Sequence, residues 1–233
     1  MNILSIDTST DLCNVGLIRD TQILAEYRAD FKRAHAEKLI SAIQFVLDGN
    51  HLELNDVDGI AISIGPGSFT GLRIGLATAK GFCFANGTKL VGINTLDSLA
   101  ENAILWKGTI CTLIHAQAEE FYMCLYESDT MTLTRLDDYK IVVIKDLVEL
   151  MTSEILFISP HSKRIIDYLE DRRFDIPRFA RSELNMMSGL TMARLGLERL
   201  KRGEQDDPEL LQPFYLKDFK AKKKGEHKIV QHR

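Results

Sequence analysis

A glycine-rich turn at residues 65–67 has the residue types that could bind a phosphate. Gly65-Pro66-Gly67 follows a short apolar run, and two glycines around a proline favour a tight turn with little side-chain cover. Ser68 or Thr70 could cap the helix that follows, and free N–H groups at a helix start favour an anion. The turn lacks the Gly-Lys-Ser/Thr ending of a P-loop and the pattern of a dinucleotide-binding loop.

The turn Asp7–Asp11 is the second candidate for contact with a nucleotide. Asp7 could contact magnesium, although we favour a role in capping the turn. The turn contains no glycine, and Asp11 adds a negative charge that would repel a phosphate. We expect no resident cofactor and at most weak or interface-bound ATP or ADP. The candidate nucleotide-binding residues are Asp7, Thr8, Gly65 and Gly67.

Small side chains recur along the predicted helix after the glycine-rich turn. Gly71, Gly75 and Ala79 are spaced by four, so they share one helical face. A glycine inside a helix costs about 1 kcal/mol relative to alanine, which favours a role in close approach of another backbone. Two interpretations stay open: packing inside this chain, for example against helix 34–48, or packing against a helix of another subunit.

Metal-binding and nucleophilic patterns are weak in this chain. His35 begins a predicted helix and has no second ligand at a suitable spacing, so we interpret it as a hydrogen-bonding residue at the helix start. No Ser/His/Asp set can be assigned, and we expect no metal site. The four cysteines form no C-x-x-C pair and lie among apolar neighbours, so we expect buried free thiols and a reducing cytoplasm.

Composition is that of an ordinary globular chain, with 233 residues, 45% hydrophobic and 27% charged. No apolar run approaches the roughly 18 residues of a membrane span, and the start of the chain reads as a core strand rather than a signal peptide. The net charge is −4. Residues 217–233 hold seven basic and two acidic side chains, which leaves −9 for residues 1–216. This basic tail is either a solvated end or a contact for phosphate groups.

Hydrophobic periodicity predicts two blocks, each with three strands followed by helices. The first block reads βββαβαβα, over strands 3–6, 12–19 and 23–27, helix 34–48, strand 58–64, helix 72–85, strand 89–93 and helix 96–105. The second block has strands 109–114, 120–127 and 139–144, a short helix 146–151, strand 155–159, and helices 162–170 and 186–202.

This order predicts an α/β protein with an actin-like ATPase (ASKHA) fold. We expect two ribonuclease-H-like lobes, each with a mixed sheet flanked by helices. The expected units are an N-terminal lobe at 1–103, a smaller C-terminal lobe at 104–216 and the basic tail at 217–233. The last long helix, about 186–202, is expected to pack back toward the first lobe.

Five segments resemble the TsaB (YeaZ) family of tRNA threonylcarbamoyladenosine proteins. They are ILSIDTST (3–10), HAEKL (35–39), GPGSFTGLRIGLATAKG (65–81), INTLDSLA (93–100) and the P-x-Y-L of Pro213–Leu216. The second block matches less well. Family members commonly carry an Asp-Ala-Arg-Arg-like run before Glu-Val-Tyr, whereas this chain reads HAQAEEFY at 115–122.

The resemblance implies a non-catalytic paralogue of TsaD, the subunit that transfers a threonylcarbamoyl group to the adenosine beside the tRNA anticodon. It implies a heterodimer with TsaD through the two helices of the first lobe, joined by the ATPase TsaE. It also implies a cytoplasmic protein without membrane contact, a homodimer when alone, and tRNA contact that is indirect or through the basic tail. The implied partner-binding residues are His35, Ala36, Leu39, Ile43, Phe69, Leu72, Gly75, Leu76, Thr78 and Ala79.

The resemblance also argues against catalysis by this chain. TsaD-like proteins carry Asn-His-Leu-Glu-x-His, whose two histidines bind a metal, and the matching stretch here has Thr95 and Leu99 at those positions. Two alternatives remain: a nucleotide-binding kinase or ATPase of the actin-like class, and an M22-type metallopeptidase, a label that this superfamily has carried.

Overall fold

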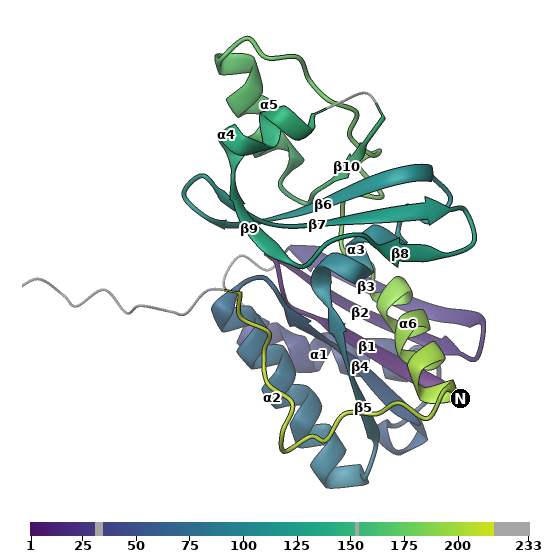
Figure 1. The fold of residues 1–233 in the computed structure, drawn as a ribbon. Coiled ribbons are helices and arrows are strands. Elements are labelled where there is room, and N and C mark those ends of the chain that lie inside the picture. Colours follow the sequence, from purple (N-terminus) through teal and green to yellow (C-terminus); the bar gives the residue numbers. More distant parts are fainter. Residues whose placement is uncertain (31–34, 152–153, 217–233) are drawn as a thin grey trace, which may run out of the picture.

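The structure is a computed structural model that describes residues 1–30, 35–151 and 154–216. Two lobes lie one above the other, each built on a β-sheet (Figure 1). The predicted basic tail, residues 217–233, lies outside the described residues.

The sheet of the first lobe has the strand order β3-β2-β1-β4-β5. Strands β1 (Asn2–Asp7), β2 (Leu12–Arg19) and β3 (Gln22–Asp30) form an antiparallel meander. Strands β4 (Gly59–Gly65) and β5 (Lys89–Asn94) continue the sheet parallel to β1. The predicted order βββαβαβα is confirmed, with the buried strands β1, β2 and β4 in the centre of the sheet and β3 and β5 at its edges.

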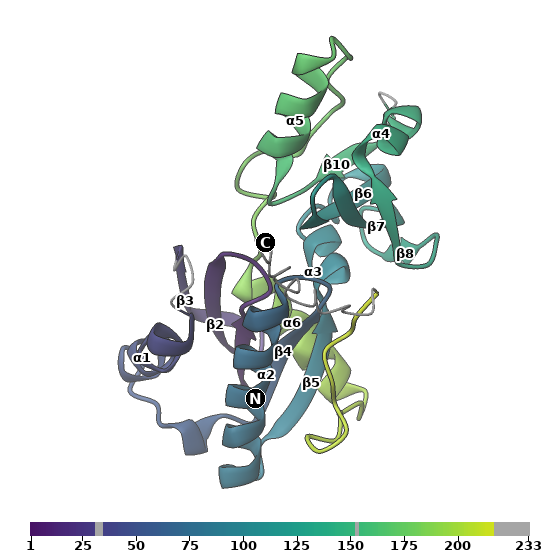
Figure 2. The ribbon, with the colours of Figure 1, turned by 90° about the vertical axis from the view of Figure 1, so that its left-hand side faces the viewer.

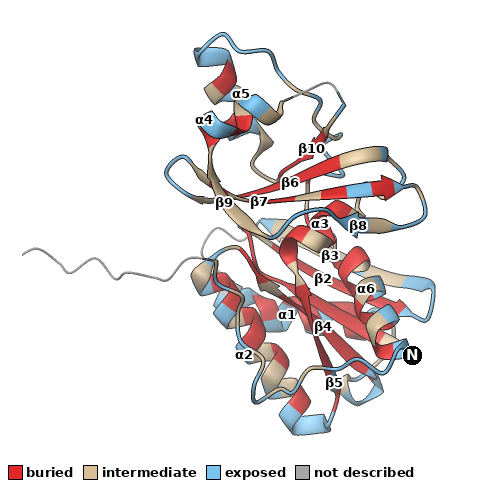
Figure 3. Cartoon of the chain, viewed as in Figure 1, coloured by how far each residue is buried: buried red, intermediate tan, exposed pale blue. Residues whose placement is uncertain are grey.

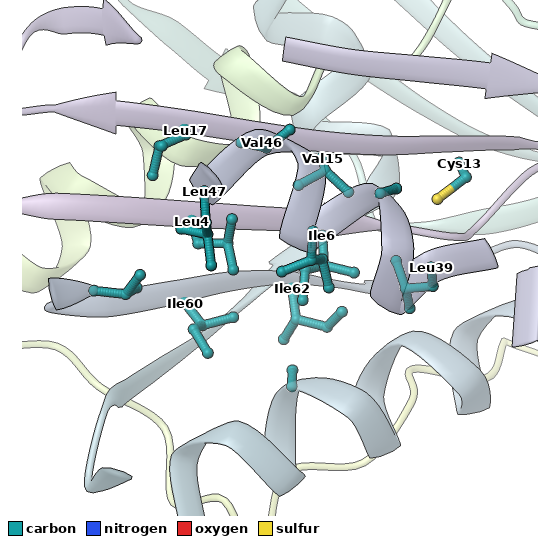
Figure 4. Close-up of a cluster of buried hydrophobic side chains, with 14 of the residues drawn as sticks. Leu4, Ile6, Cys13, Val15, Leu17, Leu39, Val46, Leu47, Ile60 and Ile62 are labelled. Atoms are coloured by element: carbon teal, nitrogen blue, oxygen red, sulfur yellow. The ribbon is translucent and has the colours of Figure 1, made fainter. Parts of the chain in front are cut away.

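Helices cover both faces of this sheet. Helices α1 (His35–Asp48) and α2 (Phe69–Asn86) lie on one face, and α6 (Gly189–Lys201) lies on the other (Figures 1 and 2). Successive side chains of β1 point to opposite faces of the sheet. Leu4 and Ile6 pack toward α1 and α2 in the core of Figure 4, while Ile3 packs toward α6.

Local capping sets the helix ends. The Ser68 hydroxyl accepts a hydrogen bond from Gly71 N and begins α2, as the sequence predicted, and Gly87 ends it in a left-handed conformation. Helix α3 (Thr95–Glu101) differs from the prediction. Asn94 is its cap, through a hydrogen bond from Leu96 N, and the helix ends at Glu101 rather than near residue 105.

The second lobe is built on a hairpin of β6 (Lys107–Gln117) and β7 (Glu120–Asp129). Strand β9 (Lys140–Val143) pairs with β7, and β10 (Leu156–Ile158) runs parallel to β6. The sequence prediction missed β8 (Leu133–Arg135), a short strand that also pairs with β7. The smaller helices are η1 (Leu54–Asp56, a 3-10 helix of the first lobe), α4 (Ile144–Leu147), η2 (Val148–Leu150, 3-10) and α5 (Ser162–Asp171).

Residues 206–216 form an extended segment that we call the C-terminal strap. It leaves α6, runs past β5 and reaches the start of α2 (Figure 1). Asp206 Oδ2 accepts a hydrogen bond from Gly92 N at 2.7 Å, and Phe214 N donates to Ile64 O at 2.7 Å. The strap therefore covers one edge of the first sheet.

Burial is greatest in the central strands of the two sheets, while β3, β8 and β9 are only partly buried and many loops are exposed (Figure 3). Among the described residues, no helix is both long enough and apolar enough to cross a membrane.

Candidate functional site

The glycine-rich turn packs directly on the turn that follows β1. A Cβ at Gly67 would overlap the Ser9 carbonyl oxygen, so the two turns are in close contact. Ser68 N donates to Ser9 O at 2.7 Å, and Gly71 N donates to the Ser68 hydroxyl at 3.2 Å. These N–H groups are used within the chain, so they cannot also bind a phosphate. Two N–H groups at the start of α2 are therefore used by the chain itself, and the assignment of Gly65 and Gly67 to a nucleotide site stays a prediction.

Asp7 and Thr8 hold the same junction together. Asp7 is fully buried, and its Oδ1 accepts a hydrogen bond from Ser9 N at 2.9 Å, as in a turn-capping aspartate. The Thr8 hydroxyl donates to Gly71 O at 2.7 Å. The candidate nucleotide-binding residues of this turn thus have structural roles.

Several buried polar atoms beside this junction have no hydrogen-bond partner among the described residues. Asp7, Asn14 and Ser63 occupy adjacent positions on β1, β2 and β4, at the edge that faces the second lobe. Thr95 and Ser98 of α3 are also buried and unpaired within the described residues. Arg28 of β3 pairs with Asn14 in the sheet, and its Nε is also buried and unpaired within the described residues. The region therefore offers neutral hydrogen-bonding groups and one guanidinium, whose Nη2 lies 3.0 Å from Glu26 Oε1.

The small-residue face of α2 turns inward. A Cβ at Gly71 would overlap the Thr8 carbonyl oxygen, and one at Gly75 would overlap the Thr8 hydroxyl. Ala79 is fully buried in the core shared with α1 and the sheet. Of the two interpretations left open, packing inside the chain is correct for this face, and its neighbours are the turn after β1 and strand β4 rather than α1 alone.

This orientation corrects most of the predicted partner-binding residues. A helix on a sheet must bury its apolar face against the sheet, so those residues serve the chain's own core. Figure 4 shows Leu39 pointing into that core. The predicted residues that are buried, and so are not available to a partner, are Leu39, Ile43, Leu72, Gly75, Leu76 and Ala79.

The other predicted partner residues differ in position. Ala36 is exposed, while Phe69 and Thr78 are partly exposed. His35 begins α1, but its side chain lies outside what the structure describes.

A second set of small and apolar residues lies on the outer side of α1 and α2. Ala77 and Gly81 are exposed four residues apart on α2, and a Cβ at Gly81 would meet nothing within 4 Å. The exposed fractions are 49% for Ile40 of α1 and 61% for Phe84 of α2. The sequence prediction missed this face, although the spacing of Ala77 and Gly81 repeats that of the inner glycines.

A groove of about 280 Å³ continues this surface between α1, α2 and η1. Its lining is mostly apolar, with Ile40 and Leu47 from α1, Phe82 from α2 and Leu52 and Leu54 beyond α1. We call the groove, with the partly buried Phe82, and the exposed residues Ile40, Ala77, Gly81 and Phe84 the α1–α2 face. An apolar surface of this kind is typical of a site for protein contact.

The stretch that resembles the metal motif of TsaD is buried and carries no ligand pair. Thr95 and Leu99 are both fully buried, and Leu99 belongs to the apolar core of the second lobe. Asp97, between them, accepts hydrogen bonds from Tyr126 and Tyr139. Within the described ranges, no three His, Cys, Asp or Glu side chains come together as metal ligands would.

The divergent stretch at 115–122 brings His115 close to His161, which precedes α5. His115 N donates to His161 Nδ1 at 3.3 Å, and the two rings lie 5.7 Å apart. Burial, with a smaller effect from His115, lowers the pKa of His161 to about 4. The His161 side chain is therefore neutral near pH 7 and adds no positive charge next to His115.

All four cysteines are buried free thiols, as the sequence predicted. Burial raises the pKa of Cys13 to about 12 and that of Cys83 to about 11, so neither thiol is a reactive nucleophile near pH 7.

Comparisons with known proteins agree with this geometry. A family model described as TsaD, tRNA N6-adenosine threonylcarbamoyltransferase, matches residues 22–198. The tRNA threonylcarbamoyladenosine biosynthesis protein TsaB of Bacillus subtilis (strain 168) is 28% identical over 181 residues, which cover 75% of this chain and 79% of that protein. TsaB of Escherichia coli (strain K12) is 33% identical over 131 residues, which cover 55% of this chain and 56% of that protein.

Solved structures show the same fold. YeaZ from Pseudomonas aeruginosa superposes with a TM-score of 0.78 at 23% identity, covering 92% of this chain and 99% of that chain. The activator of 2-hydroxyisocaproyl-CoA dehydratase from Clostridium difficile, solved with bound ADPNP, gives a TM-score of 0.54 at 8% identity, covering 87% and 97%.

The fold and the matched family model define the class: a two-lobed protein with the actin-like ATPase fold, related to TsaD. Its similarity to the bacterial relatives is more specific. Within this class, the chain belongs to the TsaB (YeaZ) family.

Proposed function

We propose that the chain acts in tRNA threonylcarbamoyladenosine biosynthesis as a non-catalytic subunit that binds and activates a TsaD-like catalytic subunit. Family membership supports a role in this pathway, since the relatives from B. subtilis and E. coli are named for it. The matched TsaD model supports a partner of related fold.

The observation that carries the proposal is the α1–α2 face. Ile40 and Phe84 are large apolar side chains with about half or more of their surface exposed. Beside them, Gly81 has free space where a side chain could stand, so the packing of this chain does not require a glycine there. A glycine in an exposed helix costs about 1 kcal/mol, and close approach of a partner helix explains why that cost is tolerated.

The non-catalytic part of the proposal rests on the roles of residues in the two turns and in α3. Ser68 N and Gly71 N are bonded within the chain, and Asp7 caps its own turn. Thr95 and Leu99 offer no histidine at the positions that carry the metal ligands in TsaD-like proteins. The chain's own residues therefore position its turns and helices rather than a nucleotide or a metal.

The proposal extends to three further interactions. A TsaE-like ATPase joins the pair, and two copies of the chain associate through the α1–α2 face when no partner is present. The pair binds tRNA, with this chain contributing indirectly or through residues 217–233. The protein works in the cytoplasm, where its tRNA substrate is found.

Reconstitution with the TsaD-like and TsaE-like proteins of the same organism tests the function. We expect the complete mixture to form threonylcarbamoyladenosine in tRNA, and the mixture without this chain to lose that activity. We also expect no product when this chain replaces the TsaD-like protein. Full activity without this chain, or product formed by this chain alone, would contradict the proposal.

A further inference from the structure

We propose that Asp97, Tyr126 and Tyr139 form an interlobe latch that holds the two lobes at one fixed angle. Asp97 lies on α3, which follows β5 of the first lobe. Tyr126 lies on β7, and Tyr139 immediately precedes β9, so both tyrosines belong to the second lobe. The latch therefore joins a helix that continues directly from the first sheet to the sheet of the second lobe.

The geometry of the latch is that of a carboxylate shared by two hydroxyl donors. Tyr126 Oη donates to Asp97 Oδ1 at 2.7 Å. Tyr139 Oη lies 2.8 Å from Asp97 Oδ1 and 2.7 Å from Asp97 Oδ2. Hydrogen bonds to a charged acceptor are short and stronger than neutral ones, and two donors fix the carboxylate in both position and orientation.

Burial strengthens the latch. Tyr126 is 2% exposed, and Tyr139 and Asp97 are partly buried. Burial, followed by the influence of Asp97, raises the pKa of both tyrosines, so both keep the proton that they donate. A partly buried carboxylate that lost these donors would keep part of its desolvation cost without the compensating bonds, so separating the lobes at this point is unfavourable.

Helix α3 also restrains the two lobes, because it makes contacts with each of them. Leu96, Leu99 and Ala100 pack into the apolar core of the second lobe, although α3 continues directly from a strand of the first sheet. On another side of α3, Asn102 Oδ1 accepts a hydrogen bond from the Thr191 hydroxyl of α6 at 2.8 Å. Helix α3 thus contacts both lobes through these residues, and Asp97 adds the polar contact with Tyr126 and Tyr139.

The C-terminal strap contacts both the latch and the start of helix α2. The Phe214 ring meets the Tyr139 ring edge-on at 5.4 Å, and Phe214 N is bonded to Ile64 O in the first lobe. Tyr215, the next residue, packs against Phe69 at the start of α2. A change of lobe angle would have to break contacts from α3, β7 and the strap together.

A distance measurement between spin labels on the two lobes tests the latch in the full chain. Lys89 of β5 and Lys145 of α4 are exposed and can be replaced by cysteine. The native cysteines are buried, and the pKa values of all four are raised, so they should not react with the label near pH 7. We expect one narrow distance distribution for the protein with the latch intact.

The variants Asp97→Ala, Tyr126→Phe and Tyr139→Phe remove the latch. We expect the distribution to broaden or shift in each, most strongly in Asp97→Ala and in the double tyrosine variant. Asp138→Ala is the control, because it removes an exposed carboxylate next to Tyr139 that does not belong to the latch. If Asp97→Ala fails to fold, the tyrosine variants, which keep both rings, decide the question. An unchanged distribution in the double tyrosine variant would overturn the proposal, and so would equal broadening in Asp138→Ala.

Discussion

At the scale of single residues, a few polar side chains fix the junctions between distant segments. Glu26 of β3 is an example, since its Oε1 accepts hydrogen bonds from the Ser188 hydroxyl and from Gly189 N at the start of α6. A carboxylate at this end of a helix satisfies free N–H groups and interacts favourably with the helix dipole. The sequence predicted the local caps at Ser68 and Asp7, but it could not predict Glu26, whose partners lie more than 160 residues away.

Replacing Glu26 with alanine should therefore destabilise the first lobe. The loss of a helix cap and of a charge at the helix start costs about 1 kcal/mol in the free energy of unfolding. Urea unfolding followed by circular dichroism measures it. Glu26→Gln keeps an acceptor atom and should lose less, and equal stability of Glu26→Ala and the parent chain would show that the contact contributes nothing.

His161 gives a pH dependence that can be assigned to one side chain. Its pKa is lowered from 6.5 to about 4 by burial, so between these pH values the unfolded chain binds more protons than the folded chain. The stability should therefore be unaffected by this group above pH 6.5 and should decrease as the pH falls from 6.5 toward 4.

His161→Gln should reduce that loss of stability. The measurement is the free energy of unfolding at two pH values, one above 6.5 and one near 4, in the variant and in the parent chain. The same pH dependence in both proteins would contradict the assignment to His161.

At the scale of elements, helix α2 has two faces with small residues and opposite roles. Gly71 and Gly75 allow the turn after β1 to approach the helix, while Ala77 and Gly81 remain open to the outside. The four-residue spacing in the sequence predicted close packing but could not predict its direction, because both faces have the same spacing. Only the position of Thr8 in the folded chain decides it.

Leucine substitutions should separate the two faces of α2. Gly75→Leu places a side chain against the Thr8 hydroxyl and Ile62, so the variant should lose about 1–3 kcal/mol of stability or fail to fold. Gly81→Leu has open space and a better helix former, so its stability should equal or exceed that of the parent chain. Thermal unfolding of both variants checks this, and the reverse order of stability would mean that the orientation of α2 is wrong.

At the scale of the whole molecule, the order of helices and strands could be predicted from the sequence, but the contacts that join the two lobes could not. Apolar periodicity predicted nearly every strand and helix, and the element order indicated two lobes. The contacts that join the lobes, such as the hydrogen bond of Asp97 with Tyr126, could not be predicted, because hydrogen bonds between distant polar residues leave no periodic pattern in the sequence. The C-terminal strap was likewise only an irregular segment around Pro208 and Pro213 in the sequence.

Phe214→Ala tests how much the strap contributes to the whole fold. Its partly buried ring contacts Tyr139, so its removal should lower the free energy of unfolding by about 1–2 kcal/mol. Leu210→Ala in the same strap is the matched control, since Leu210 is 75% exposed and its removal should change stability by less than about 0.5 kcal/mol. Equal effects of the two substitutions in urea unfolding would argue against a structural role for Phe214.

The central claim is that this chain works through the outer surface of α1 and α2. The most direct test is the dissociation constant of its complex with the TsaD-like subunit, measured by calorimetry for Gly81→Leu, Gly81→Ala and the parent chain. Glu170→Leu on α5 of the second lobe is the control for an added exposed leucine. We predict that Gly81→Leu weakens the complex about tenfold or more, equivalent to about 1.4 kcal/mol, and that Gly81→Ala weakens it less, while Glu170→Leu binds as the parent does. Parent-like affinity of a folded Gly81→Leu would contradict the account.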